Sequence, residues 1–219
     1  ELVKINNGTS GSIVLNTATV ALSGTVANIK SAFAGTITTH TGTLEISDAN
    51  NTDITATDIT TINTAISGAI TVTNTIDING SGSEVAAAFT AIDTNTGNAT
   101  ANVTGTDYTV AHLKTINAAT TGAIVLATPT ASLSGTVSDI VAAFAGTVTT
   151  NTGVVTISDT DETDITATDI TAIDTASTGN ITVSNAIDIN GSGSEVAAAF
   201  TAINTNTGNA TANVTGTDY

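Results

Sequence analysis

The chain has 219 residues and a formal net charge of −16, because 19 acidic residues face only three basic ones. So few cations cannot neutralise a phosphate backbone, which excludes nucleic acid as a partner. Charged residues make up only 10% of the chain and hydrophobic residues 40%, a composition that excludes intrinsic disorder. The chain has no cysteine, and no apolar run approaches the ~20 residues of a membrane span.

Short alternations of apolar and polar residues recur along the chain with the period of two that is typical of strands. In chain order they lie at Ile13–Leu15, Leu44–Ile46, Ile70–Val72, Ala101–Val103, Ile124–Leu126, Val155–Ile157, Ile181–Val183 and Ala212–Val214. Further short strands are predicted at Ile76–Ile78 and Ile187–Ile189. Successive alternations begin 23 to 31 residues apart, a length that fits one strand and one short helix.

Short helices are predicted between these strands. Ser81 and Glu84 form a capping box, the S-x-x-E pattern that starts a helix, and Thr25 is the cap of a related helix. A second kind of helix starts near Thr57 and ends at Gly68. The same signals recur later in the chain, at Ser192, Glu195, Thr136, Thr168 and Gly179.

The dominant feature of the sequence is a tandem repeat. Residues 11–108 align without gaps with residues 122–219 at an offset of 111, and about three-quarters of the positions are identical. The most similar part, residues 76–108, differs from residues 187–219 only by the change of Asp93 to Asn204. We therefore divide the chain into a first copy, residues 1–111, and a second copy, residues 112–219, of four coils each. Neither end carries a polar capping repeat, so we expect a fragment of a longer array.

Strands that alternate with helices imply parallel pairing with right-handed crossovers. The sequence therefore predicts an α/β fold: one continuous right-handed β/α solenoid of about eight coils. It would be similar to a leucine-rich repeat, with a parallel sheet on one side and short helices on the other. Strands stack ~4.8 Å apart and helices ~8–10 Å apart, so modest curvature is expected. A globular, doubly wound sheet is the alternative fold.

One acidic cluster is a candidate metal site. Asp159, Asp161, Glu162 and Asp164 follow the strand predicted at Val155–Ile157. Calcium takes six to eight oxygen ligands from loops of this kind, so these residues are the candidate ligands and calcium is the one cofactor considered. The alternative is a solvated turn, for which Asp and Asn are favoured by their local hydrogen bonding.

The remaining polar motifs favour structure over chemistry. Asp93–Gly97 resembles the start of a calcium loop, but the twelfth position is Thr104 where an EF-hand needs Glu, so a β-turn is the favoured interpretation. The two histidines, His40 and His112, have no histidine counterpart in the other copy. No residue is assigned to catalysis or to organic cofactor binding, and we expect that the protein is not an enzyme.

The segments LSGTVSDIVAAF, GVVTISDTDETDITATDITAIDTASTG and AHLKTINAATTG carry a resemblance that covers nearly the whole chain. They resemble the Thr/Ala/Gly/Asp-rich tandem repeats of giant secreted or cell-surface proteins of marine bacteria and cyanobacteria. The resemblance implies an extracellular or cell-surface location and a structural or adhesive role. The G-G-x-G-x-D nonapeptide of calcium β-rolls is absent.

Together these features predict a non-catalytic structural repeat module, the spacer or fibre segment of an extracellular or cell-surface protein. The alternative function is a calcium-dependent adhesin or a carbohydrate-binding surface module. The expected partners are other copies that stack end to end, or neighbouring repeats of the same chain, together with a surface glycan. Neither nucleic-acid binding nor membrane insertion is expected.

Overall fold

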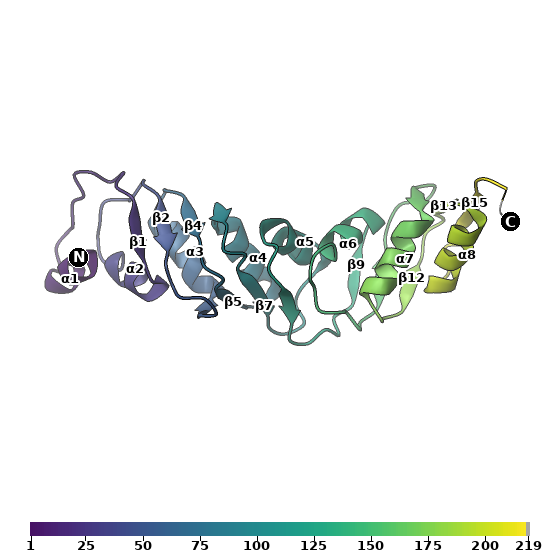
Figure 1. Ribbon diagram of the computed structural model, residues 1–219, viewed down its shortest axis with the longest axis horizontal. Coiled ribbons are helices and arrows are strands. Elements are labelled where there is room, and N and C mark those ends of the chain that lie inside the picture. Colours follow the sequence, from purple (N-terminus) through teal and green to yellow (C-terminus); the bar gives the residue numbers. More distant parts are fainter. Residues whose placement is uncertain (218–219) are drawn as a thin grey trace.

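Helices and strands alternate along an elongated array in the computed structural model, which describes residues 1–217 (Figure 1). The first helix, α1, lies at one end and the last, α8, at the other, and each helix packs against the next one in the chain. The eight helices within residues 1–217 are α1 (Leu2–Gly8), α2 (Val26–Ala32), α3 (Ala56–Ala65), α4 (Gly82–Ala91), α5 (Val110–Ala119), α6 (Val137–Ala143), α7 (Ala167–Ala176) and α8 (Gly193–Ala202).

The strands of this part of the chain form four separate sheets, and all their pairings are parallel. The first copy contributes the sheet β1 (Leu22–Gly24), β2 (Leu44–Ile46), β4 (Ile70–Val72), β6 (Thr94–Asn95). A second sheet joins the two copies and consists of β3 (Asp53–Thr55), β5 (Asp77–Gly80), β7 (Thr100–Val103), β8 (Ile124–Leu126). The second copy contributes β9 (Leu133–Gly135), β10 (Val155–Ile157), β12 (Ile181–Val183), β14 (Ile203–Asn206), and separately β11 (Asp164–Thr166), β13 (Asp188–Gly191), β15 (Thr211–Val214).

The strand register places apolar side chains of successive repeats directly beside one another. Ile54 pairs with Ile78, Ile78 with Ala101, and Ala101 with Ile124. The buried residues form one cluster that runs from Val26 to Ile203, so the core is shared by every neighbouring pair of repeats. Because a short strand of one repeat buries little surface alone, burial depends on the repeats on either side of it.

The helix starts follow the sequence signals. Ser81 Oγ accepts from the backbone N–H of Glu84, whose Oε2 accepts from Ser81 N at 2.9 Å, so the predicted capping box is confirmed. Thr25 caps α2 as expected, by accepting from Asn28 N. The helix that was expected to end at Gly68 ends earlier, at Ala65, because Ile66 is extended and forms a parallel bridge with His40.

Ion pairs and amide groups link neighbouring helices. Lys30 of α2 pairs with Asp58 of α3, and Lys114 of α5 pairs with Asp139 of α6. The hydrogen bond from Lys114, together with its positive charge, lowers the pKa of the Asp139 carboxyl below its ordinary value. Both pairs are partly exposed to solvent, so they orient the helices more than they stabilise them.

The repeated α/β architecture with parallel strands agrees with the expectation from sequence, but the single sheet does not. The strands lie in four sheets because each repeat contributes two short strands separated by a turn, such as the turn that contains Asn51 at φ 58°. The sequence does not signal strands such as β3, in which only Ile54 is buried, since one apolar residue makes no alternation.

The expected strand at Ile13–Leu15 is also wrong in the first copy. Only Ile13 forms a bridge there, with Ile37, whereas the counterpart segment Ile124–Leu126 is the full strand β8. The difference has a direct cause: β8 has β7 of the preceding repeat beside it, and Ile13–Leu15 has no such neighbour within the described residues.

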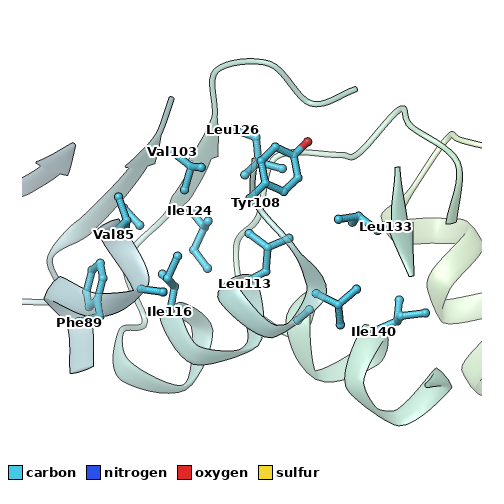
Figure 2. Close-up of a cluster of buried hydrophobic side chains, with 14 of the residues drawn as sticks. Val85, Phe89, Val103, Tyr108, Leu113, Ile116, Ile124, Leu126, Leu133 and Ile140 are labelled. Atoms are coloured by element: carbon cyan, nitrogen blue, oxygen red, sulfur yellow. The ribbon is translucent and has the colours of Figure 1, made fainter. Parts of the chain in front are cut away.

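Tyr108 lies at the junction of the two copies, in the core between β7 and β8 (Figure 2). Its hydroxyl lies 3.2 Å from both the carbonyl oxygen of Thr128 and Oδ1 of Asn151, and 3.4 Å from the N–H of Ala131. The tyrosine of the first copy is therefore hydrogen-bonded to two turns of the second. Burial raises the pKa of the phenol above its ordinary value.

Replacing Tyr108 by Phe is expected to lower the free energy of unfolding by about 1–2 kcal/mol, because Asn151 is left buried without that partner. A raised pKa in the folded state favours the protonated phenol, so this contribution is complete below pH ~10 and is lost as pH rises through the folded pKa. Urea unfolding between pH 8 and 11 tests both points. Equal alkaline slopes for the wild type and Tyr108→Phe would contradict the assignment.

Glycines let the backbones of neighbouring repeats touch. A Cβ on Gly179 would lie 1.7 Å from the carbonyl oxygen of Gly153, and a Cβ on Gly68 would lie 1.8 Å from that of Gly42. A real Cβ cannot occupy either position, so any side chain would push two repeats apart.

Gly179→Ala is expected to destabilise the fold by roughly 3 kcal/mol or more, since the overlap is with backbone that has no rotamer to adjust. The matched control is Gly8→Ala, where nothing lies within 4 Å of the added carbon and the change should be within about 0.5 kcal/mol. Thermal unfolding followed by circular dichroism compares them, and similar melting temperatures for the two variants would refute the close contact.

Candidate functional site

The acidic turn after β10 contains all four candidate calcium ligands, and its first carboxylate is buried. Asp159 is 7% exposed, and its Oδ2 accepts from the backbone N–H of Val137 at 2.7 Å. Val137 is the first residue of α6 in the preceding repeat. Asp48 makes the same 2.7 Å bond to Val26, the first residue of α2. Each aspartate therefore caps the helix of the repeat before it, a favourable position for a negative charge.

Asp161 and Asp164 also bond to a neighbouring repeat. Oδ1 of Asp161 accepts from the N–H of Ala186 at 2.8 Å, and Oδ1 of Asp164 accepts from Nδ2 of Asn190 at 2.9 Å. In the first copy the corresponding acceptors are Asn50, bonded to Thr75 N, and Asp53, bonded to Asn79. An Asn serves where Asp161 stands, so this contact requires an acceptor oxygen and no negative charge.

Glu162 has a conformational role that its side chain does not explain. Its φ is 61°, in the left-handed region, and its N–H donates to the carbonyl oxygen of Ala186 at 2.8 Å. The other non-glycine residues with positive φ within residues 1–217 are all asparagines: Asn51, Asn98 and Asn209. Asn tolerates this region better than Glu, so Glu162 occupies a strained position.

The four acidic residues are therefore neighbours in sequence whose described contacts point in different directions. In residues 1–217, no three His, Cys, Asp or Glu side chains come together as a group that could hold a metal ion. The calcium assignment to these residues stays a prediction, which needs a measurement with the ion present.

The same kind of contact recurs at positions that sequence reasoning did not assign. Asp107 accepts from the N–H of Gly82, the first residue of α4, at 3.0 Å. Asp93, singled out above as the start of a calcium-like loop, accepts from Ile70 N at 2.8 Å. Its counterpart Asn204 accepts from Ile181 N at 2.7 Å, so the one change in the most similar segment preserves the bond. The available signal was an Asp or Asn 22 to 25 residues after the amide it receives.

The two histidines lie in different repeats and are placed differently. His40 is buried, its ring centroid is 6.1 Å from that of Phe33, and its Nε2 has no hydrogen-bond partner. Its counterpart Asn151 bonds to Tyr108 instead. His112 is on α5, and its Nδ1 likewise has no partner. Neither of these ring nitrogens is held by a carboxylate, as the base of a catalytic triad would be.

A shallow groove of about 400 Å³ lies between α1 and β1, lined by apolar side chains that include Leu2, Leu22 and Phe33. The same place in the second copy, beside Gly135, is filled by Val110 of α5, whose Cγ1 would lie 3.1 Å from a Cβ on that glycine. The groove therefore has the shape of a packing site between repeats.

Comparison with family models, with curated proteins and with solved structures finds no match for this chain. None of the helices in residues 1–217 is long and apolar enough to cross a membrane. The candidate site therefore stands on its geometry.

Asp159→Ala is expected to lower the free energy of unfolding by about 2 kcal/mol, because the buried N–H of Val137 loses its acceptor at a helix start. Asp159→Asn keeps an acceptor oxygen and should lose less than about half as much. Urea denaturation of the two variants measures the difference. Equal losses would show that the charge matters here and the hydrogen bond does not.

Glu162→Asn is expected to stabilise the protein by about 1 kcal/mol in calcium-free buffer, because Asn relieves the left-handed strain. Melting temperatures with excess Ca²⁺ and with chelator provide the test. If calcium raises the melting temperature of the wild type and Glu162→Asn removes that rise, Glu162 is a metal ligand and the structural interpretation fails.

Proposed function

We propose that this protein is a non-catalytic structural repeat module, a spacer or fibre segment of a larger extracellular or cell-surface protein. The observation that carries the proposal is the use of its polar residues. Asp48, Asp93, Asp107 and Asp159 all accept from backbone amides of the preceding repeat. The residues best suited to a binding site are thereby engaged in holding successive repeats together.

The duplication of these contacts supports the same conclusion. A recognition site needs one particular constellation, whereas a spacer needs contacts that can be copied. The bond from Val26 to Asp48 is copied as that from Val137 to Asp159, both at 2.7 Å. The Asp-to-Asn changes between the copies keep the acceptor oxygen and alter the charge, which is the tolerance expected of structural contacts.

The proposed architecture is a right-handed solenoid of about eight coils, four in each copy. Its support is the regular offset of the pairings: Leu44 pairs with Ile70 and Val155 with Ile181, each one repeat apart. The row of eight helices in residues 1–217, each packed on the next, agrees with one helix per coil.

The location and partners belong to the same proposal. The resemblance to repeats of secreted and cell-surface proteins supports an extracellular position. A net charge of −16 opposes both nucleic-acid binding and attachment to anionic membranes, and it limits lateral clumping. Partners would be neighbouring repeats or further copies of the chain, stacked end to end.

A calcium-dependent adhesin that binds a surface glycan is the second candidate function. It is favoured by one observation, the exposed position of Asp161, Glu162 and Asp164 on a single turn. The melting comparison with and without calcium described for Glu162→Asn distinguishes it from the spacer.

Small-angle X-ray scattering of the 219-residue chain tests the proposed shape. Eight helices in a row, about 8–10 Å apart, give a rod roughly 70 Å long with a radius of gyration of about 22 Å for the single chain. A globular domain of this size would have about 17 Å. Extrapolation to zero concentration removes any association, and a value near that of the globular domain would contradict the spacer.

A further inference from the structure

The junction between the two copies shows how one repeat receives another. Strand β7 lies beside β8 in parallel, with Ala101 opposite Ile124, Asn102 opposite Val125 and Val103 opposite Leu126. Backbone hydrogen bonds join them, from Ala101 N to the carbonyl oxygen of Ala123 and from Ala127 N to that of Val103, both 2.9 Å. Apolar side chains from both copies meet there in a continuous core (Figure 2).

The turn before β8 adds polar contacts to this junction. Thr120 donates to the carbonyl oxygen of Ala99 and Thr121 to Oδ1 of Asn98, both at 2.7 Å. Gly122 follows them, and a Cβ there would lie 2.4 Å from the carbonyl oxygen of Asn98. The turn therefore fits against the preceding repeat only when this residue is glycine.

The donating half of the junction recurs at the end of the second copy. Strand β15 repeats the sequence TANV of β7, but it is an edge strand. Val214 is 42% exposed where Val103 is buried, and Phe200 is half-buried where Phe89 is buried. Asn209 has the same left-handed backbone as Asn98, with φ of 55° and 54°.

The receiving half recurs at the start of the first copy. Ile13, Val14 and Leu15 correspond to β8, and Val14 is 71% exposed. Ile5 is 49% exposed where its counterpart Ile116 is fully buried. Thr9 accepts from Gly11 N at 3.0 Å, as Thr120 accepts from Gly122 N at 2.9 Å, so the turn already has its docked shape.

Gly11 is the sharpest sign of a missing neighbour. A Cβ on it would meet only Thr9 Oγ1, at 3.3 Å, so nothing in the chain itself prevents a larger residue there. Its counterpart Gly122 has no such freedom, because Asn98 and Ala99 of the preceding repeat press against it.

We infer that β15 of one copy of this chain docks in parallel beside residues 13–15 of a second copy, in the register of β7 and β8. Ala212 then lies opposite Ile13, Asn213 opposite Val14 and Val214 opposite Leu15, while α8 packs on α1. Thr9 and Ser10 donate to Ala210 and Asn209, as Thr120 and Thr121 donate to their counterparts. This inference rests on the end-to-end association of the proposed function and identifies its surfaces.

The docking has a defined growth pattern. The two surfaces differ and lie at opposite ends of the array, so each added copy leaves one of each surface open and the product is a filament. Because every copy carries a net charge of −16, repulsion opposes growth at low salt, and association strengthens as salt screens it.

The test mixes two single-cysteine variants of the full chain, Asn213→Cys and Val14→Cys, with a short bismaleimide at physiological or higher salt. The chain has no native cysteine, so each product reports one contact. The expected result is a covalent dimer from this mixture. The matched control pairs Asn213→Cys with Val125→Cys, because Val125 is 42% exposed but already has β7 of its own chain beside it. This control mixture should give little dimer.

A Gly11→Leu change added to the Val14→Cys chain should lower the dimer yield at least about tenfold, although an exposed leucine would promote nonspecific association. Circular dichroism should show unchanged melting of this variant at low concentration. Equal cross-linking in the control, no effect of Gly11→Leu, or no dimer at all would each overturn the docking. The spacer would still stand if scattering shows a rod, and it would fail separately if scattering shows a compact monomer.

Discussion

The structure depends on hydrogen bonds in which the backbone of one repeat is satisfied by the next. The strands are three or four residues long, so their pairing and their helix starts rely on acceptors from neighbouring repeats. Asp48, Asp107 and Asp159 provide these acceptors at helix starts, and Asp93 and Asn204 at strands. A buried amide without an acceptor would destabilise two repeats at once, which explains why these positions keep an acceptor oxygen in both copies.

This constraint also explains the composition. Aromatic residues are 3% of the chain, and the layers between repeats are filled by Ile, Val, Leu and Ala. Glycines allow carbonyl groups of adjacent repeats to approach where any Cβ would collide, as at Gly68 and Gly179. Threonine and asparagine then provide compact donors and acceptors on the turns. The acidity of the chain comes mostly from structural aspartates and from solvated turns, so it does not by itself indicate a ligand.

Much of the local structure could be predicted from the sequence, because the capping signals and apolar alternations act within a few residues. The capping box at Ser81 and the strand at Leu44–Ile46 are examples. The division into four sheets could not be predicted, since β3 buries a single residue and its partner β5 comes from another repeat. For the candidate site, sequence located the acidic turn but not its contacts: Asp159 binds an amide 22 residues earlier, a relation that pattern reading within one turn cannot detect.

Native-state amide hydrogen exchange measured by NMR tests the central claim most directly. The amides of Val26, Ile70, Gly82 and Val137 are bonded to Asp side chains of the following repeat. The account predicts that they exchange as slowly as amides inside the parallel strands, and that opening of one repeat exposes amides of its neighbour. If they exchange as fast as unprotected loop amides, these aspartates do not hold the repeats together, and a binding role for the acidic turns becomes the better explanation.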